Sequence, residues 1–350
     1  MRSAVLTFSG DALLASYHLG AGASVIQRAL ASNRPVTHIV GCSSGSLLAA
    51  GFVGQLGGAE FRPHQALAHL IRFGRDLRRP DLVCARELRR ARHFSNPFET
   101  VLNRVLDSGL IDYEAVLRSP TNLIVTGARI HSQTIQRCGR LALETLRAGW
   151  NVFRNGHDPE AAFTAAMSGL TLVASGAVTP VYFSTHALST DVQNWIRSRG
   201  GEYQQIVDPA GLREALRHST RMPIIFGRPV DGIIDGAFAD CSAVPLALQL
   251  GSDDVYGFTS SPNGHFFERP IQGAVLRQTS RIARSAARLR FVAETLPLER
   301  PIQLTEEDDA RFQRVHPSRR LRGLRFVSLG RAVHHADFKT GRATGEQIAV

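Results

Sequence analysis

The stretch Thr37-His-Ile-Val-Gly-Cys-Ser-Ser-Gly-Ser-Leu47 decides how the rest of the chain is interpreted. Its first half predicts a buried strand that ends at Gly41, and an apolar run with helical character begins at Ser44. Between them, Gly41-Cys-Ser43-Ser-Gly45 has the G-x-S-x-G pattern of a nucleophile elbow. So tight a strand-to-helix corner leaves no room for side chains at the two glycines, and it presents the serine hydroxyl to a pocket. Ser43 is therefore the candidate nucleophile.

Two interpretations of Ser43 stay open at this level. Serine often stands at the start of a helix, where its side chain accepts a backbone N–H and takes part in no chemistry. The preceding strand and the two glycines favour a catalytic serine instead. The helix that begins at Ser44 would also direct its free N–H groups and the positive end of its dipole toward the site.

Length and composition limit the class of protein. The chain has 350 residues, of which 43% are hydrophobic, as expected for one large globular domain or two small ones. No apolar run reaches the ~18–20 residues of a membrane span, and the N-terminus lacks the apolar core of a signal peptide, so we expect a cytoplasmic protein. The four cysteines form no C-x-x-C pair and the 13 histidines include no H-E-x-x-H. We expect no metal and no cofactor.

A net charge of +11 predicts an anionic partner. Arginines concentrate in residues 72–92 and on one face of an expected helix at 276–291. Such runs are often solvated helix faces, but they also fit peripheral contact with an anionic membrane surface. We expect no nucleic-acid partner, because no groove-reading motif or set of stacking aromatic residues accompanies the arginines.

The order of the expected elements predicts an α/β fold with a mainly parallel central sheet. A strand at 4–9, a helix at 13–30, a strand at 36–41 and a helix at 44–56 give a β-α-β-α start. Further strands are expected at 122–128, 181–185, 229–235 and 255–259, with residues 134–137 as a hairpin partner of the first. Further helices are expected at 61–92, 159–167, 209–219 and 244–250. From about Gly264 the composition changes, so we interpret residues 1–263 as the catalytic domain and residues 264–350 as a C-terminal extension packed on it.

Three separated segments carry a family resemblance. The first is Phe8-Ser-Gly-Asp-Ala-Leu-Leu-Ala-Ser-Tyr-His-Leu-Gly20, and the second is Gly41–Leu47. The third comprises Ala215-Leu-Arg-His-Ser-Thr-Arg-Met-Pro223 and Val230-Asp-Gly-Ile-Ile-Asp-Gly-Ala237. In this order and spacing they resemble the glycine-rich loop, the nucleophile elbow and the D-G-G/A motif of the patatin-like phospholipases.

The resemblance implies a three-layer α/β/α fold and a serine lipid acyl hydrolase with a Ser–Asp dyad. Ser43 would be the nucleophile and Asp235, in the Asp235-Gly236 motif, its base. The oxyanion hole would be formed by loop residues Gly10, Asp11 and Ala12. The substrate would be a phospholipid or another acyl-ester lipid, cleaved without a metal through an acyl-enzyme on Ser43.

The first segment departs from the family pattern. Ala12 and Ala15 stand where the family usually has glycine, and Asp11 lies among the expected oxyanion donors. Alanine at a position that needs a positive φ costs about 1 kcal/mol. An ionised carboxylate that faced the hole would repel the oxyanion. A catalytically silent protein of the same fold, which binds lipid or a protein partner, is therefore the alternative.

Other residues compete for the acid–base role. Asp231 begins a second Asp-Gly dipeptide four residues before Asp235, and Asp240 is a further carboxylate. We prefer Asp235 because two isoleucines precede it, as expected at the end of a strand. The order Ser43, Asp235, His334 also matches the triad order of α/β-hydrolases, although the elbow of that fold usually follows several strands rather than one.

Overall fold

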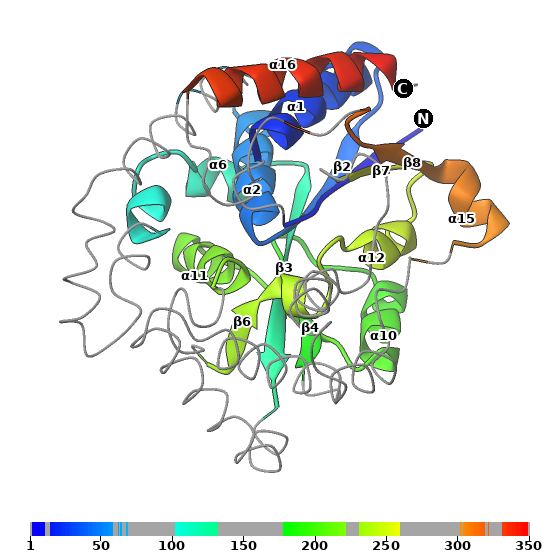
Figure 1. Ribbon diagram of the computed structural model, residues 1–350. Coiled ribbons are helices and arrows are strands. Elements are labelled where there is room, and N and C mark those ends of the chain that lie inside the picture. Colours follow the sequence, from blue (N-terminus) through cyan, green and yellow to red (C-terminus); the bar gives the residue numbers. More distant parts are fainter. Residues whose placement is uncertain are drawn as a thin grey trace, which may run out of the picture.

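A mostly parallel sheet of eight strands lies at the centre of the part of the chain that the computed structural model describes (Figure 1). That part comprises residues 2–10, 15–58, 62, 64, 68, 102–131, 178–221, 231–259, 302, 304–318, 321 and 331–348. The strands are β1 (Ala4–Phe8), β2 (Val36–Cys42), β3 (Asn122–Ile130), β4 (Val178–Ser184), β5 (Glu202–Gln205), β6 (Ile233–Asp235), β7 (Asp254–Phe258) and β8 (Phe312–Val315). The helices are α1 (Ala15–Ala31), α2 (Ser44–Leu56), α6 (Tyr113–Arg118), α10 (Thr190–Ser198), α11 (Pro209–Ser219), α12 (Val244–Gln249), α15 (Glu306–Arg311) and α16 (Arg331–Gln347).

The strand order is β5-β4-β3-β2-β1-β7-β8, and β6 pairs with β3 beside this path. Strands β1, β2, β3, β7 and β8 run in one direction, whereas β4, β5 and β6 run in the other. The first strand of the chain therefore lies inside the sheet, between β2 and β7. Every residue of β1 is buried, as expected for a parallel strand that is covered on both faces. The prediction of an α/β fold with a mainly parallel sheet is confirmed.

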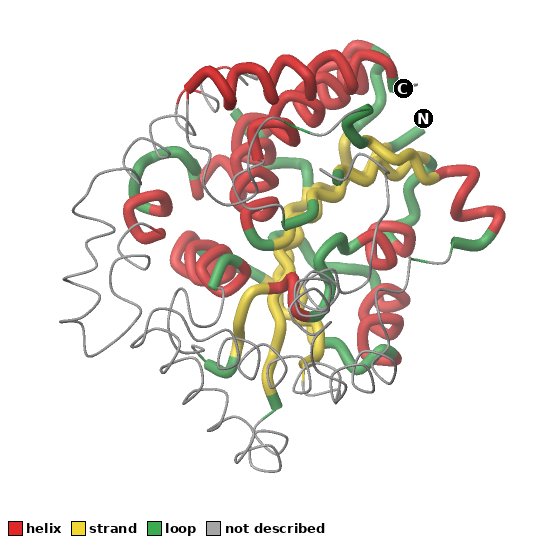
Figure 2. Tube along the Cα trace, viewed as in Figure 1, coloured by secondary structure: helices red, strands yellow, loops and turns green. Residues whose placement is uncertain are grey.

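Helices cover both faces of the sheet. Successive residues of a strand face opposite sides, and β1 shows the result. Leu6 and Phe8 join a buried cluster with side chains from α1, α2 and α11, whereas Val5 joins a second cluster with side chains from α10 and α12. Figure 2 shows this arrangement as yellow strands with red helices on either side. The described residues thus form three layers: helix, sheet and helix.

Most predicted elements are present with similar bounds. Helices α2 and α11 begin and end at the predicted residues, and β1, β2, β3, β4, β6, β7, α1 and α12 lie within a few residues of their predicted ranges. Elements without a prediction are α6, α10, β5, α15, β8 and α16. Elements α6, β5, α15 and β8 have only four to six residues, and β5 has the polar sequence Glu-Tyr-Gln-Gln, so they are too short to show a hydrophobic period. Helix α10 does have an apolar pattern, at Val192, Trp195 and Ile196, which the prediction missed.

Residues from the C-terminal part of the chain join the same sheet and the same helical layer. Strand β8 pairs with β7 in parallel, and α16 lies along α1 (Figure 1). The two helices approach closely because Gly20 lies against the Phe338 carbonyl and Gly341 against the Tyr17 carbonyl, where a Cβ would clash. The Arg28 guanidinium of α1 donates to main-chain carbonyls at the end of α16, including that of Glu346 at 2.6 Å. The expected boundary between residues 263 and 264 lies outside the described ranges.

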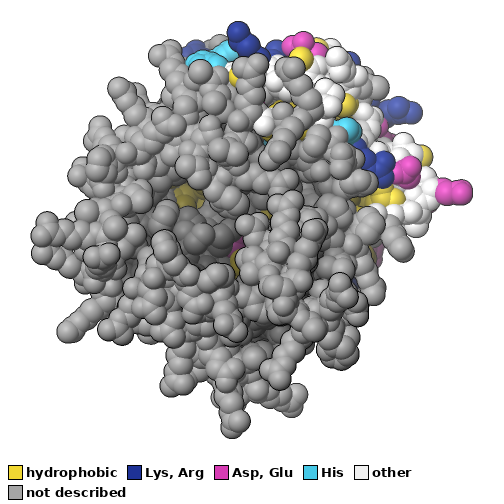
Figure 3. Space-filling view, viewed as in Figure 1, with side chains coloured by type: hydrophobic (Ala, Val, Ile, Leu, Met, Phe, Trp, Pro, Cys, Tyr) yellow, Lys and Arg dark blue, Asp and Glu magenta, His cyan; other side chains and the backbone are white. Residues whose placement is uncertain are grey.

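Several expectations lie outside the described residues. They are the arginine-rich helix at 61–92 apart from three single positions, the hairpin partner at 134–137, the helix at 159–167 and the basic helix at 276–291. Within the described ranges, no helix combines the length and the hydropathy needed to cross a membrane. In Figure 3 the coloured side chains over α15 and α16 carry both signs of charge, so this part of the face is mixed rather than uniformly positive.

Candidate active site

The carboxyl ends of two strands meet on one edge of β3. Strand β2 runs parallel to β3 and ends opposite Thr126, where Cys42 is the paired residue. Strand β6 runs antiparallel to β3 along the same edge and ends opposite Gly127, where Asp235 is the paired residue. Because the two strands point at each other, the residues at their ends become neighbours although 192 positions separate Ser43 from Asp235.

Ser43 occupies a strained corner between β2 and α2. Its backbone has φ 52° and ψ −128°, a left-handed conformation that non-glycine residues rarely adopt. A Cβ on Gly41 would lie 2.5 Å from the Ser46 Cα, and a Cβ on Gly45 would lie 2.7 Å from the Ser9 carbonyl oxygen. The corner is therefore too crowded for any residue but glycine at these two positions. This is the geometry that the elbow pattern predicts.

The Ser43 hydroxyl donates a hydrogen bond to the Asp235 carboxylate, with Oγ and Oδ2 2.7 Å apart. Asp235 is fully buried, and its other oxygen accepts the Ala237 N–H at 2.9 Å. Burial raises the pKa of Asp235 from its ordinary value of 3.8 to about 7, and the hydrogen bonds from Ser43 and Ala237 offset part of that effect. The carboxylate is thus placed and tuned to exchange a proton with the serine near neutral pH.

Small buried side chains and one close backbone contact surround the pair. Cys42, Ala237 and Cys241 form a buried cluster beside it, which accounts for the loss of solvation at Asp235. Gly236 lies against the Thr126 carbonyl, where a Cβ would clash. Both cysteines are free thiols. In the described part of the chain, no group of three or more His, Cys, Asp or Glu residues is arranged to hold a metal ion.

Gly10 covers the serine from the loop that follows β1. A Cβ at Gly10 would lie 2.7 Å from the Ser43 Cβ and 3.5 Å from its Oγ, so only glycine allows the loop to pass this close. The other two expected oxyanion residues, Asp11 and Ala12, lie outside the described residues. Helix α2 begins at Ser44, and the first N–H groups of a helix have no partner within it. Backbone donors are therefore available next to the Ser43 hydroxyl.

The competing carboxylates have other surroundings. Asp231 lies in a turn with φ 52°, and 78% of its side chain is exposed. Asp240 is buried, accepts the Tyr182 hydroxyl at 2.7 Å and accepts the Ala243 N–H at 2.9 Å, so it supports the turn before α12. Neither has a hydrogen bond to Ser43 among the described residues. The side chain of His334 lies outside them.

One residue of the site has no sequence signal. Thr126 lies in the middle of β3, opposite the point where β2 ends, and its hydroxyl donates to the Gly41 carbonyl at 3.3 Å. It therefore holds the first glycine of the elbow, while its own carbonyl faces Gly236. A threonine inside a buried strand belongs to no motif, and only the pairing register reveals its place.

The fold and the site together define a class: an α/β protein with a serine at a strained strand-to-helix corner, hydrogen-bonded to a buried carboxylate. Comparison of the chain with protein-family models and with curated proteins found no significant match. The geometry of Ser43 and Asp235 and the sequence motifs around them are therefore the features that point to a function.

Proposed function

We propose that this chain is a patatin-like serine hydrolase that cleaves carboxylic esters of phospholipids or related acyl lipids. The observation that carries the proposal is the direct hydrogen bond of 2.7 Å between the strained Ser43 and the buried Asp235. The order of the glycine-rich segment, the elbow and the Asp-Gly motif supports the same family. The choice of a lipid substrate depends on the resemblance alone.

Asp235 acts as the general base of the reaction. A serine hydroxyl is a weak nucleophile and needs a base within hydrogen-bond reach, which Asp235 Oδ2 already is. A carboxylate with an ordinary pKa would be too weak a base. A pKa near 7 makes Asp235 a stronger base that is still largely ionised above neutral pH.

The reaction proceeds through an acyl-enzyme. Ser43 Oγ attacks the ester carbonyl while its proton moves to Asp235, and that proton then passes to the leaving alcohol. Backbone N–H groups at Gly10 and at the start of α2 stabilise the oxyanion of the tetrahedral intermediate. A water molecule that gives its proton to Asp235 then attacks the acyl-enzyme, and the fatty acid leaves as Ser43 regains a proton.

The proposed place of action is the cytoplasm, with peripheral contact to an anionic membrane surface where the substrate lies. The net charge of +11 supports this contact, since anionic head groups attract arginine side chains. Binding to vesicles of neutral and anionic phospholipid tests it. Binding that is equal for both vesicle types would contradict the electrostatic part of the proposal.

Hydrolysis of a medium-chain p-nitrophenyl ester and of a fluorogenic phospholipid tests the function itself. Ser43→Ala should lower both rates by roughly 10³-fold or more, because the covalent step is lost. The control is Ser198→Ala, which removes an exposed serine on α10 and should leave both rates unchanged. A fluorophosphonate should label wild type and not Ser43→Ala. Activity retained by pure Ser43→Ala contradicts the proposal, and wild type that neither hydrolyses nor labels points to the silent, lipid-binding alternative.

A further inference from the structure

We infer that Ser219 is a positioning residue, whose hydroxyl anchors the backbone of the nucleophile and so keeps Ser43 Oγ on Asp235. The Ser43 N–H donates to Ser219 Oγ at 2.9 Å, across 176 positions of sequence. Ser219 is fully buried at the end of α11, which shields the acceptor side of this bond from water, and Ser43 is half-buried. The inference rests on the proposed function, because it assigns Ser219 a part in that reaction.

The same short segment also holds the base. The Asp235 N–H donates to the Arg221 carbonyl oxygen at 2.9 Å. Two residues after Ser219, this carbonyl fixes the strand end that carries the carboxylate. The segment 219–221 therefore bonds to the main chain of both members of the dyad. The distance between Oγ and Oδ2 is set by one rigid piece of backbone rather than by two independent ones.

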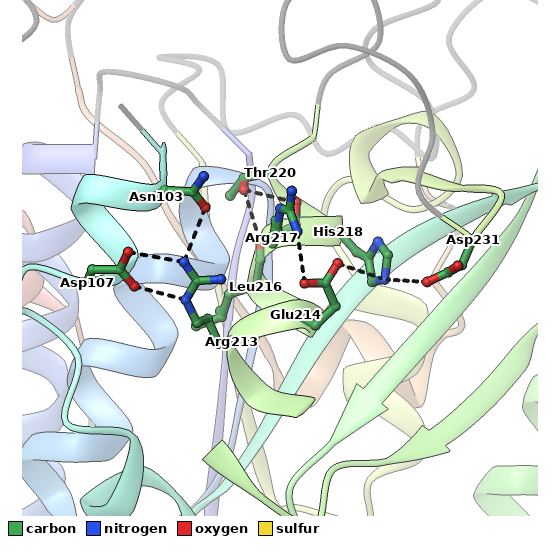
Figure 4. A network of polar contacts seen from close by, with 9 residues as sticks. All are labelled: Asn103, Asp107, Arg213, Glu214, Leu216, Arg217, His218, Thr220 and Asp231. Atoms are coloured by element: carbon green, nitrogen blue, oxygen red, sulfur yellow. Dashed lines mark hydrogen bonds and ion pairs between the residues drawn. The ribbon is translucent and has the colours of Figure 1, made fainter. Parts of the chain in front are cut away.

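Contacts along α11 keep that segment in place (Figure 4). Arg213 donates to Asp107 at 2.9 Å and to Asn103 at 3.2 Å, which ties the helix to residues 102–107. The Thr220 hydroxyl, in contrast, donates within α11 itself, to the Leu216 carbonyl at 2.9 Å, and so does not link the helix to another element. The ring of His218 stacks on Phe183 of β4, with centroids 5.9 Å apart. The end of α11 is thus fixed to a neighbouring segment and to the sheet.

The nucleophile needs such an anchor. A residue held at φ 52° persists in that conformation only when its surroundings determine it more strongly than its own preference does. Removing the Ser219 hydroxyl takes away the acceptor of the Ser43 N–H and frees the corner to relax. Small misplacements of a reacting group lower rates by about 10²-fold. The loss should therefore appear in kcat rather than in KM.

Ser219→Ala is the test, and Thr220→Val is its matched control, since both remove one buried hydroxyl from neighbouring positions. Ser219→Ala should lower kcat by about 10- to 100-fold with KM within about twofold, whereas Thr220→Val should keep kcat within about twofold. Ser219→Thr keeps the acceptor and should restore most of the rate. Equal losses of kcat in Ser219→Ala and Thr220→Val would overturn the inference, because they would indicate a general effect of destabilising α11.

The pH profile gives a second readout that loss of stability would not change. The Ser43 hydrogen bond lowers the pKa of Asp235, so a loosened Ser43 should let that pKa rise. The acidic limb of kcat/KM should then move to higher pH in Ser219→Ala and stay in place in Thr220→Val. An unmoved limb in Ser219→Ala contradicts the positioning role.

Amide exchange separates this inference from the proposed function. The Ser43 amide of wild type should exchange slowly in NMR, and at least about tenfold faster in Ser219→Ala. This measurement needs no hydrolysis, so an inactive wild type would end the functional proposal while exchange still decides whether Ser219 anchors the corner. Unchanged protection of Ser43 in Ser219→Ala overturns the inference. Should Ser219→Ala not fold, Ser219→Cys, whose sulfur is a weaker acceptor, should show the same changes at smaller size.

Discussion

Two Asp-Gly dipeptides lie four residues apart in this chain and have opposite surroundings. Asp231 belongs to an exposed turn, and the next residue, Gly232, has φ +71°. Asp235 ends strand β6, is fully buried and accepts the Ser43 hydroxyl. Gly236 follows with a negative φ and is needed for space, since it lies against the Thr126 carbonyl. The same dipeptide therefore has two different roles. Gly232 allows the backbone conformation of a turn, whereas Gly236 allows close packing beside Asp235.

The difference shows that the chemistry of a carboxylate is set by its surroundings and not by its local motif. Burial and two hydrogen bonds determine the pKa of Asp235, and the pairing of β6 with β3 places it beside Ser43. Substitutions in the two dipeptides can therefore test each part of the comparison separately.

The largest expected effect is the loss of kcat/KM in the variant Asp235→Asn. The amide has nearly the same shape but cannot take the serine proton, so kcat/KM should fall by about 10²–10⁴-fold. Asp231→Asn makes the same chemical change at the exposed dipeptide and should leave kcat/KM within about twofold. Ester hydrolysis with both variants, after circular dichroism has shown that each is folded, measures the contrast. Equal losses in the two variants would contradict the assignment of Asp235.

The second effect is on stability and follows from the raised pKa of Asp235. A carboxyl whose pKa is about 7 when folded and 3.8 when unfolded favours folding in its neutral form. This contribution is fully present below pH 3.8 and is lost as the pH rises through 7. It should amount to about 4 kcal/mol between pH 4 and pH 8. Urea unfolding of wild type and Asp235→Asn across this range should show the difference.

Asp231→Asn is the control for this stability measurement. Its free energy of unfolding should follow the wild-type pH dependence, since the Asp231 side chain is mostly exposed. If the free energy of unfolding of wild type and of Asp235→Asn had the same pH dependence, burial would not raise the pKa of Asp235 as described.

The third effect is on the rate as a function of pH. Only ionised Asp235 can accept the serine proton, so kcat/KM should rise with pH and level off above about pH 7. At pH 5 it should be roughly 100-fold below the plateau. Asp231→Asn should show the same limb. If kcat/KM instead levelled off above about pH 4, the ordinary range of an aspartate, the result would contradict the raised pKa of Asp235.

The smallest effects should come from the glycines. Gly236→Ala puts a methyl group against the Thr126 carbonyl and should lower both stability, by about 1–3 kcal/mol, and kcat. Gly232→Ala would make only ordinary van der Waals contacts, but the position has a positive φ, so the substitution should cost about 1 kcal/mol with unchanged kcat. Thermal unfolding and ester hydrolysis measured on both variants distinguish a packing role from a conformational one. Loss of kcat in Gly232→Ala would contradict the prediction that Gly232 acts only on the conformation of its turn.

Local signals in the sequence predicted much of the fold. Helix α11 begins after Asp208, whose side chain caps it, and has proline in its first turn, so its bounds could be read directly. The prediction that two isoleucines lead Asp235 to the end of a strand is confirmed by β6. The reversed direction of β4 and β5 was not predicted, because no local pattern fixes which way a buried strand enters a sheet.

The pairing within the candidate site could not be derived from local patterns. It was expected from a resemblance, and its physical reason is the meeting of β2 and β6 on β3, a long-range property of register. Ser219 lies in one of the three motif segments but has no role that the sequence alone predicts, and Thr126 belongs to no motif. Both act through hydrogen bonds to backbone that is remote in sequence, and only a folded chain brings these partners together.

The packing of α16 on α1 has a consequence for how the protein is made. Helix α1 ends at Ala31 and its partner begins at Arg331, 300 residues later, while β1 lies between β2 and the late strand β7. At about 5–20 residues per second, a ribosome needs roughly 15–60 s to synthesise that interval. Until β7 and later α16 have been made, β1 and α1 each lack one of their neighbours. Because the loop over Ser43 joins β1 to α1, both elements that flank this loop depend for their packing on segments that are made much later.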